Sequence, residues 1–380
     1  MLRLGSLFSG IGGFEFTAQL VNIKPVWASE IVPECVGVTK RHFPEIQHLG
    51  DITKLNGADI EPVDIITFGS PCTDISNAGK RAGLVDGKQS SLFFEAIRIV
   101  KEMRGVTNGK YPRFIVWENV FGAFSTNRGE DFQRVIQEIS SIANEKISIP
   151  RPSRKPTGEL IWEPAGAIMG DSWTLAWRVM DAQYFGVPQR RRRIFLVADF
   201  RGKRAGEILF KPDSLPGDFA ESREQKERIT EDTKKRSGNA NKKQYAVDFG
   251  RVGDRIQMNV DKAVTLQSGG GGGAGKTGLY CLPTYYCQQR NDEYKKSDVS
   301  KTLASRDYKS PTDLINYGYA VRRLTPLECE RLQGIPDKWT EYDVNGKKIS
   351  DSARYKALGN SVAIPCVLRV LSAIKDVYEE

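Results

Sequence analysis

Short apolar runs alternate with amphipathic stretches along the first 200 residues of this chain. The apolar runs have the length of buried strands, and they are Leu2–Phe8, Pro25–Ser29, Asp64–Phe68, Phe114–Trp117 and Ile194–Ala198. The stretches between them carry apolar residues at helical spacing, and they are Phe14–Asn22, Pro33–His42, Leu92–Met103 and Asp131–Ile142. This alternation predicts an α/β fold with a doubly wound, mainly parallel sheet.

The pattern changes after residue 200. Residues 201–243 are dominated by charged side chains, and residues 262–320 hold short β-like runs separated by glycine, serine and aspartate. An amphipathic helix is predicted over 361–380, and the proline-rich segment 151–171 predicts a long loop or small insertion. We therefore expect one domain over 1–200 that is completed by a C-terminal helix within 350–380, and a second, smaller, loop-rich domain over 201–349.

Charge and composition narrow the function classes. The net charge of +9 favours a polyanionic partner, with nucleic acid ahead of an acidic membrane. No signal peptide and no apolar run long enough to span a membrane is recognisable, so a cytoplasmic protein is expected. The six cysteines are scattered without a CxxC pair and there are only two histidines. This scarcity argues against a metal site, a disulfide framework and histidine-based catalysis.

A cysteine and a glutamate each follow a predicted buried strand. Pro71-Cys72 comes after the run that ends at Phe68, and Glu118-Asn119-Val120 follows the run that ends at Trp117. The carboxyl ends of parallel strands meet at one edge of an open sheet, where ligands bind. A thiol nucleophile beside a carboxylic acid can activate a ring that is hard to alkylate, such as cytosine.

A glycine-rich turn and two acids indicate a nucleoside site. The turn Phe8–Gly13 follows the first strand and opens the first helix, but Glu15 stands where a dinucleotide fingerprint needs glycine or alanine. Glu30 ends the second strand and can accept ribose hydroxyls, and Asp51 suits an adenine amino group. Each acid could instead serve only as a helix cap or turn residue.

Two further motifs carry positive charge. Gln189 is followed by four arginines, and alternation at a strand start would send Arg191 and Arg193 to one face, able to bind phosphate or a base carbonyl. Residues 270–277 match a phosphate-binding loop letter for letter, but no helix can open after them. We interpret that loop as a segment that lies against a sugar–phosphate backbone, with Lys276 on a phosphate.

In order along the chain, these motifs resemble the DNA (cytosine-5) methyltransferase family. The ordered set is Phe8–Gly13, Glu30, Asp51, Gly69–Cys72, Glu118–Val120, Gln189–Arg193, Arg323–Glu328, Arg331–Pro336 and Gly359–Val362. The resemblance covers the N-terminal half and the last 60 residues. Residues from about 200 to 320 match no motif, as expected for the variable target-recognition region of that family.

The resemblance implies a role for each motif. Cys72 would be the nucleophile, Glu118 the acid near the cytosine ring nitrogen, and Arg193 the donor to the base carbonyl, supported by Arg191. S-adenosylmethionine would be the cofactor, in a pocket formed by Phe8, Gly10, Ile11, Gly12, Gly13, Glu30, Ile31, Asp51, Ile52, Pro71, Leu92, Asn360, Ser361 and Val362. The DNA contacts would come from Ser76, Lys80, Arg81, Gln189, Gly270, Gly271 and Lys276. No metal is expected.

One departure and two alternatives accompany this interpretation. The family usually has glutamine after the catalytic cysteine and an aromatic residue before the serine, whereas this chain reads Cys72-Thr73-Asp74-Ile75-Ser76. The expected activity is methylation of flipped-out cytosine in double-stranded DNA at a short site, by a monomer with a cognate restriction endonuclease as a candidate partner. The alternatives are a tRNA cytosine-5 methyltransferase and a catalytically silent DNA-binding regulator.

Overall fold

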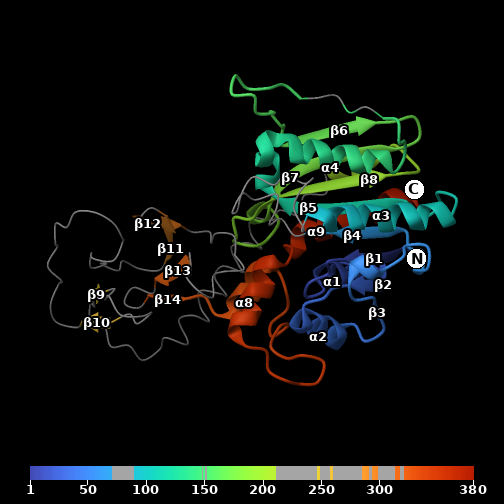
Figure 1. Ribbon diagram of the computed structural model, residues 1–380. Coiled ribbons are helices and arrows are strands. Elements are labelled where there is room, and N and C mark those ends of the chain that lie inside the picture. The colour runs from blue at the N-terminus through green and yellow to red at the C-terminus, as the bar shows by residue number, and fades with distance from the viewer. Residues whose placement is uncertain are drawn as a thin grey trace.

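The computed structural model describes residues 1–70, 90–147, 149, 152–210 and 321–380, together with five short strands between residues 246 and 316. Its centre is an eight-stranded sheet in the order β3-β2-β1-β4-β5-β8-β7-β6 (Figure 1). The strands are β1 (Arg3–Leu7), β2 (Lys24–Ser29), β3 (Gln47–His48), β4 (Ile65–Phe68), β5 (Phe114–Val120), β6 (Ala165–Met169), β7 (Thr174–Asp181) and β8 (Arg192–Asp199). The five predicted strands are confirmed. The pairs from β3 to β5 are parallel, and β8, β7 and β6 each run antiparallel to the strand before them.

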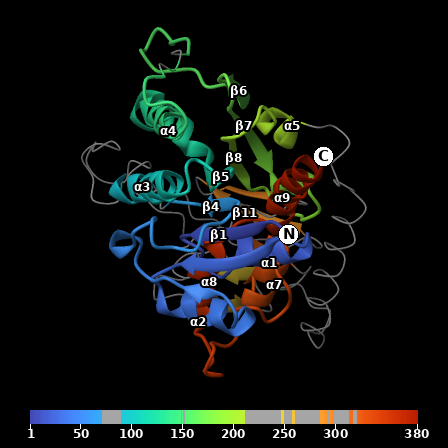
Figure 2. The same ribbon diagram turned by 90° about the vertical axis from the view of Figure 1, so that its right-hand side faces the viewer.

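Helices cover both faces of the sheet. Figure 2 shows α3 and α4 on one side and α1, α5 and α9 on the other. The helices are α1 (Gly13–Leu20), α2 (Pro33–His42), α3 (Ser90–Val106), α4 (Glu130–Ser141), α5 (Ala205–Phe210), α7 (Pro326–Gln333), α8 (Asp351–Asn360) and α9 (Ile364–Glu379). This arrangement buries one apolar cluster on each face, so the predicted doubly wound fold is confirmed.

Three strands of the sheet, β3, β6 and β7, escape prediction from the sequence. The prediction of a loop over 151–171 is wrong for β6, which pairs antiparallel with β7. β6 lies at the sheet edge with alternate residues exposed, and Arg178 and Asp181 interrupt the apolar pattern of β7. Short edge strands and polar interruptions weaken the period-2 signal on which the prediction depends.

The C-terminal residues return to the first half of the chain. The single helix predicted over 361–380 is α9, which begins at Ile364, and α7 and α8 precede it. Thr325 and Glu328 form a capping box at the start of α7. Leu324, Cys329 and Leu332 pack in one apolar cluster with Ile11 of the glycine turn. Residues 324–349 therefore pack with the N-terminal part, although the sequence places them in the second domain.

The remaining strands form two small antiparallel sheets. β9 (Ala246–Asp248) pairs with β10 (Gln257–Asn259). The second sheet has the order β12-β11-β13-β14, formed by β11 (Tyr285–Arg290), β12 (Glu293–Ser297), β13 (Asp313–Asn316) and β14 (Val321–Arg323). The glycine loop at 270–277 lies outside the described residues.

In the part of the chain that the structure describes, no single helix has the length and apolar composition needed to cross a membrane. Among the described helices, only α8 and α9 taken together reach that length and apolar composition, and they meet at a bend of 41°.

Glu15 is fully buried beneath the glycine turn. Its carboxyl accepts a hydrogen bond from the Ser6 hydroxyl, and its Oε2 has no hydrogen-bond partner among the described residues. Burial raises the pKa of Glu15 to about 7, although the Ser6 hydrogen bond acts in the opposite direction. The residue that departs from the dinucleotide fingerprint is therefore a buried acid that releases its proton near neutral pH.

This burial predicts a pH-dependent stability. The unfolded chain releases the Glu15 proton near pH 4.5 and the folded chain near pH 7, so stability falls as pH rises between those values and then levels off. Glu15→Gln cannot ionise, and we expect its free energy of unfolding, measured by chemical denaturation, to gain on that of the wild type between pH 5 and pH 8, by an amount on the order of 2–3 kcal/mol. The exposed Glu34 provides the control: a gain of similar size in Glu34→Gln would contradict the assignment to Glu15.

Candidate active site

The end of β5 places a carboxylate beside a guanidinium. β8 pairs antiparallel with β5, so that Val120 lies opposite Arg193. The Glu118 Oε1 atom lies 3.2 Å from the Arg193 Nε atom, and only 11% and 13% of these two side chains are exposed. Oε1 makes no hydrogen bond of good geometry with any described residue. The structure thus brings together two of the predicted catalytic residues, with a buried carboxylate oxygen still able to bind a ligand.

The neighbouring strand end leads directly to the predicted nucleophile. A Cβ added to Gly69 would lie 3.3 Å from Glu118 Oε2, and the Asn119 side chain donates to the Ser70 carbonyl at 3.4 Å. Glu118 and Asn119 therefore contact the last two described residues before Pro71-Cys72. A side chain at position 69 would therefore require the Glu118 carboxylate to shift by a few tenths of an ångström. The predicted residues Pro71, Cys72, Ser76, Lys80 and Arg81, with Gly270, Gly271 and Lys276, lie outside the described residues.

The arginine run alternates between buried and exposed positions, as predicted. Arg191 and Arg193 turn inward, whereas Arg190 and Arg192 are exposed. Arg191 donates to the carbonyl oxygens of Gly359, at 3.2 Å, and Ser361. Burial, and then the nearby Arg193, lower the pKa of Arg191 to about 9. The edge of the sheet that carries Glu118 and Arg193 is called the candidate catalytic edge. Arg191 therefore links the catalytic edge to the Gly359–Val362 motif.

Gln189, predicted as a DNA contact, is fully buried. Neither polar atom of its side chain has a hydrogen-bond partner among the described residues. A direct contact between Gln189 and DNA would require this side chain to move, and it stays a prediction.

The glycine turn and Glu30 form one unit. Phe8, Gly10 and Gly12 have positive φ angles, which the tight turn requires. The Gly10 amide donates to Glu30 Oε2 at 2.9 Å, and the amides of Ile31 and Val32 donate to Oε1 at 2.8 and 2.9 Å. These three bonds fix the carboxylate at the end of β2. A carboxylate has about four acceptor sites, so Glu30 retains capacity for a ribose hydroxyl.

Asp51 caps a short helical turn, Ile52–Lys54. Its Oδ1 accepts from the Thr53 amide at 3.0 Å and from the Thr53 hydroxyl at 2.8 Å, and these bonds lower the pKa of Asp51. Asp51 therefore does serve as a helix cap, which is the structural alternative given for it above. Oδ2 makes no hydrogen bond to the described residues, so the cap and a contact with an adenine amino group are compatible.

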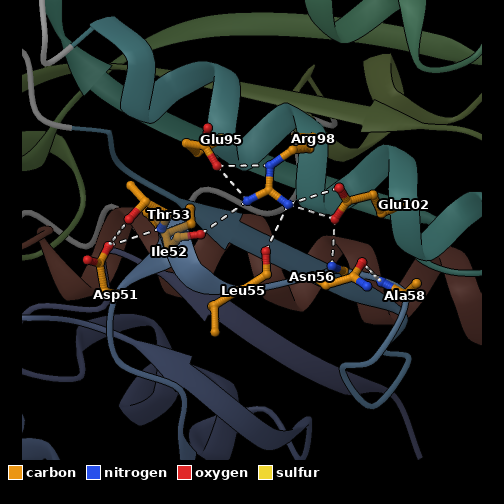
Figure 3. A network of polar contacts seen from close by, with 10 residues as sticks. Asp51, Ile52, Thr53, Leu55, Asn56, Ala58, Glu95, Arg98 and Glu102 are labelled. Atoms are coloured by element: carbon orange, nitrogen blue, oxygen red, sulfur yellow. Dashed lines mark hydrogen bonds and ion pairs between the residues drawn. The ribbon is translucent and has the colours of Figure 1, made fainter.

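Arg98 on α3 holds this turn in place, as Figure 3 shows. Its guanidinium donates to the carbonyl oxygens of Leu55 at 2.8 Å and Ile52 at 3.2 Å. Glu95 and Glu102 hold the guanidinium from either side, and Glu102 also accepts from the Gly57 amide at 2.7 Å. The sequence gives no sign of this role, because charges at i, i+3 and i+4 on a helix usually indicate a solvated face.

C-terminal residues close the glycine turn from the other side. A Cβ added to Gly13 would lie 2.8 Å from Val362 Cγ2 and 3.5 Å from Ser361 Oγ. The Trp339 indole donates to the Ile11 carbonyl at 2.8 Å, and His42 stacks on the indole with the ring centroids 3.6 Å apart. Trp339 is a contact that sequence reasoning missed.

The other predicted cofactor residues lie around this turn. Ile11 and Ile52 are buried, Leu92 is partly buried against the core, and Ile31 and Asn360 are exposed. Glycine backbone, two fixed acids and flanking apolar side chains together suit a nucleoside with a short amino-acid tail. Among the described residues no cluster of histidine, cysteine, aspartate or glutamate could hold a metal ion.

Relatives of this chain are DNA methyltransferases. The chain is 29% identical to a DNA N-6-adenine-methyltransferase of Escherichia phage P1, over 96% of this chain and 60% of that protein. It is also 29% identical to the type II methyltransferase M1.ScrFI of Lactococcus lactis subsp. cremoris, over the whole chain and 79% of that protein. The chain therefore spans less than two thirds of the phage protein but most of the length of M1.ScrFI.

Solved structures show the same fold. The S. pombe Dnmt2 methyltransferase superposes with a TM-score of 0.55 at 17% identity, over the full length of both chains. The Entamoeba histolytica methyltransferase EhMeth gives a TM-score of 0.57 at 13% identity, over 100% of this chain and 99% of that one. The C-5 cytosine-specific DNA methylase family matches residues 2–144 and 168–376, which include every motif of the catalytic edge and of the glycine turn. With the buried Glu118–Arg193 pair at the strand ends, this match establishes that the chain belongs to the C-5 cytosine-specific DNA methylase family.

Proposed function

We propose that this chain methylates carbon 5 of cytosine in double-stranded DNA, with S-adenosylmethionine as methyl donor. The observation that carries the proposal is the Glu118–Arg193 pair, 3.2 Å apart and buried beside Gly69 and Ser70. This arrangement supports a pyrimidine held edge-on, with its ring nitrogen at Glu118 and its carbonyl oxygen at Arg193. A base inside a duplex cannot reach such a buried edge, so the cytosine would be flipped out.

Each residue then has one chemical task. The Cys72 thiolate attacks carbon 6 of the ring while Glu118 donates a proton to ring nitrogen 3, which leaves electron density on carbon 5. S-adenosylmethionine supplies the methyl group that carbon 5 takes up. Loss of the carbon 5 proton to solvent, elimination of the Cys72 thiolate from carbon 6 and return of the ring nitrogen 3 proton to Glu118 then restore the aromatic ring and the enzyme. Arg193 holds the carbonyl oxygen and supplies the positive charge that favours a thiolate nearby.

The glycine turn forms the proposed cofactor pocket. Glu30 would accept the ribose hydroxyls, Asp51 would accept from the adenine amino group, and the Ile52 backbone would lie beside the purine. Arg191 and Trp339 would act indirectly, because they hold the Gly359–Val362 segment and the Ile11 carbonyl that border the pocket. The pocket is thus shaped by elements from both ends of the chain.

Domain roles follow from this placement. Residues 1–200 with the C-terminal helices would form the catalytic domain, and the segment that ends near residue 323 would read the target sequence. The glycine loop around Lys276 would lie on the DNA backbone, and Ser76, Lys80 and Arg81 would approach the flipped base. We expect a monomer, with a cognate restriction endonuclease as a candidate partner.

The name of the phage P1 relative raises adenine as a second target base. Methyl transfer to an exocyclic amine needs no covalent activation of a ring carbon, so it would leave Cys72 without a role. Plasmid DNA from cells that express this chain should carry 5-methylcytosine by bisulfite sequencing. N6-methyladenine without 5-methylcytosine would overturn the proposal, and methylation of tRNA alone would favour the tRNA branch of the family.

The acid can be tested by Glu118→Gln, which keeps the shape but cannot donate a proton. We expect turnover to fall by about 10²-fold or more while DNA affinity changes little. Cys72→Ala should abolish turnover, and wild-type protein should be trapped covalently on 5-fluorocytosine DNA, because fluorine cannot leave as a proton does. Glu130→Gln, an exposed glutamate on α4, is the matched control. Wild-type turnover in Glu118→Gln would reduce Glu118 to a structural residue.

The role of Arg98 gives a separate prediction. Arg98→Met keeps the alkyl stem but releases the carbonyl oxygens of Ile52 and Leu55, so the turn that carries Asp51 should loosen. We expect S-adenosylmethionine to bind about 5- to 20-fold more weakly by calorimetry, as loss of charge-assisted hydrogen bonds requires. Arg134→Met is the control, because Arg134 pairs with Glu138 at helical spacing on α4. If both variants bound S-adenosylmethionine with equal affinity, the hydrogen bonds from Arg98 to Ile52 and Leu55 would not shape the pocket.

A further inference from the structure

The arginine run leaves two guanidinium groups that the proposed chemistry does not use. Arg191 and Arg193 face the interior, whereas Arg190 and Arg192 are exposed at the start of β8. The register places Arg192 opposite Asp181 of β7, at the same edge of the sheet as Glu118. Positive charge is therefore concentrated beside the site and not only within it.

Arg192 lies over the face of an exposed aromatic ring. Its guanidinium carbon is 4.1 Å from the centroid of the Phe121 ring, and 38% of Phe121 is exposed. Phe121 comes directly after Val120 at the end of β5, and its ring packs edge-on against the buried Phe124 with centroids 5.5 Å apart. A guanidinium that lies flat on an anchored aromatic ring presents a rigid flat surface on which a base can stack.

Arg192 also lines a pocket at the end of β7. The pocket has a volume of about 660 Å³, and its lining includes Arg178, Asp181, Tyr184, Phe185, Arg190 and Arg192. Three arginines face one acid, and 54% of Tyr184 is exposed. Asp181 already accepts from the Arg191 amide at 2.9 Å and from the Gln183 side chain at 2.8 Å. The lining is thus positively charged with aromatic surface, which fits a strand of phosphates and bases better than a neutral ligand.

The position of the pocket matches the geometry of a DNA strand. The pocket is lined from β8 and β7, the first and second strands beyond β5, and neighbouring strands lie about 4.8 Å apart, so the pocket reaches about 10 Å from the line of Glu118. B-DNA rises about 3.4 Å per base pair along its axis, so this offset corresponds to about three base-pair steps. A strand whose target base sits at Glu118 and Arg193, and which runs along this edge toward β7, would pass over Phe121 and Arg192 and reach the pocket.

We propose that Phe121, Arg190 and Arg192, with the pocket lined by Tyr184, bind the DNA strand that flanks the target cytosine. Arg190 and Arg192 contact successive phosphates through their N–H groups, and the Arg192 guanidinium, held flat on the Phe121 ring, stacks on a base next to the flipped position. These residues and the pocket together form the flanking-strand surface. This inference rests on the proposed function, and it adds a binding surface formed by the catalytic domain alone.

The test compares duplex binding in the full-length protein. The probe is a fluorescent duplex of about 30 base pairs that carries a site mapped by bisulfite sequencing, titrated at several salt concentrations. In Arg190→Ala/Arg192→Ala the slope of log affinity against log salt should fall by about two units. Phe121→Ala should weaken binding about 5- to 100-fold with an unchanged slope, because it removes stacking and no charge. The affinity of each variant for S-adenosylmethionine should equal that of the wild type, which shows that the variant is folded.

Lys110→Ala is the matched control. Lys110 is exposed, lies over the ring of Tyr111 at 5.2 Å, and precedes β5 at the opposite edge of the sheet. Its removal should leave affinity and salt slope unchanged. If the wild type methylates cytosine but the double variant keeps the wild-type slope, the flanking-strand surface is wrong and the proposed function stands. If the wild type does not methylate cytosine, the same titration is run on a duplex of random sequence, and a lower salt slope in the double variant would then leave the surface standing although the proposed function fails.

Discussion

The antiparallel pairing of β8 with β5 is the constraint on which the catalytic edge depends. If β8 ran parallel to β5, it would begin at the opposite edge of the sheet, away from Glu118. Because β8 runs the other way, its start lies beside the end of β5, and the Arg193 guanidinium meets the Glu118 carboxylate. The same reversal places Arg191 near Gly359 and Ser361. One change of strand direction therefore connects the acid, the arginines and the C-terminal motif.

A second constraint is the closure of the glycine turn by residues more than 300 positions away. A turn with several positive φ angles presents backbone groups that need partners, and Trp339 satisfies the Ile11 carbonyl. Behind Trp339, the buried Glu330 carboxylate accepts from the amides of Lys338 and Thr340 and from Arg354. Removing either member of that ion pair would leave a buried charge without its partner. The network fixes the indole and, through it, the turn.

Much of this arrangement is predictable from sequence, for identifiable reasons. Five strands and four helices between residues 1 and 200 carry a clear period of hydrophobicity, and Glu118 and Arg193 fall where strand ends place them. β6 and β7 escape because edge exposure and polar residues blur the period. Arg98 and Trp339 escape for another reason: their partners are carbonyl oxygens, which leave no mark on residue identity.

The glycine turn lies near the start of the chain, but the residues that cover it lie near the end, and this separation has a consequence for synthesis on the ribosome. The sheet and its catalytic edge are encoded before residue 200, and they leave the ribosome well before Trp339, Ser361 and Val362 are made. Until those residues arrive, Ile11 and Gly13 lack the side chains that cover them in the folded protein. A growing chain therefore exposes an unfinished glycine turn until translation has passed residue 362.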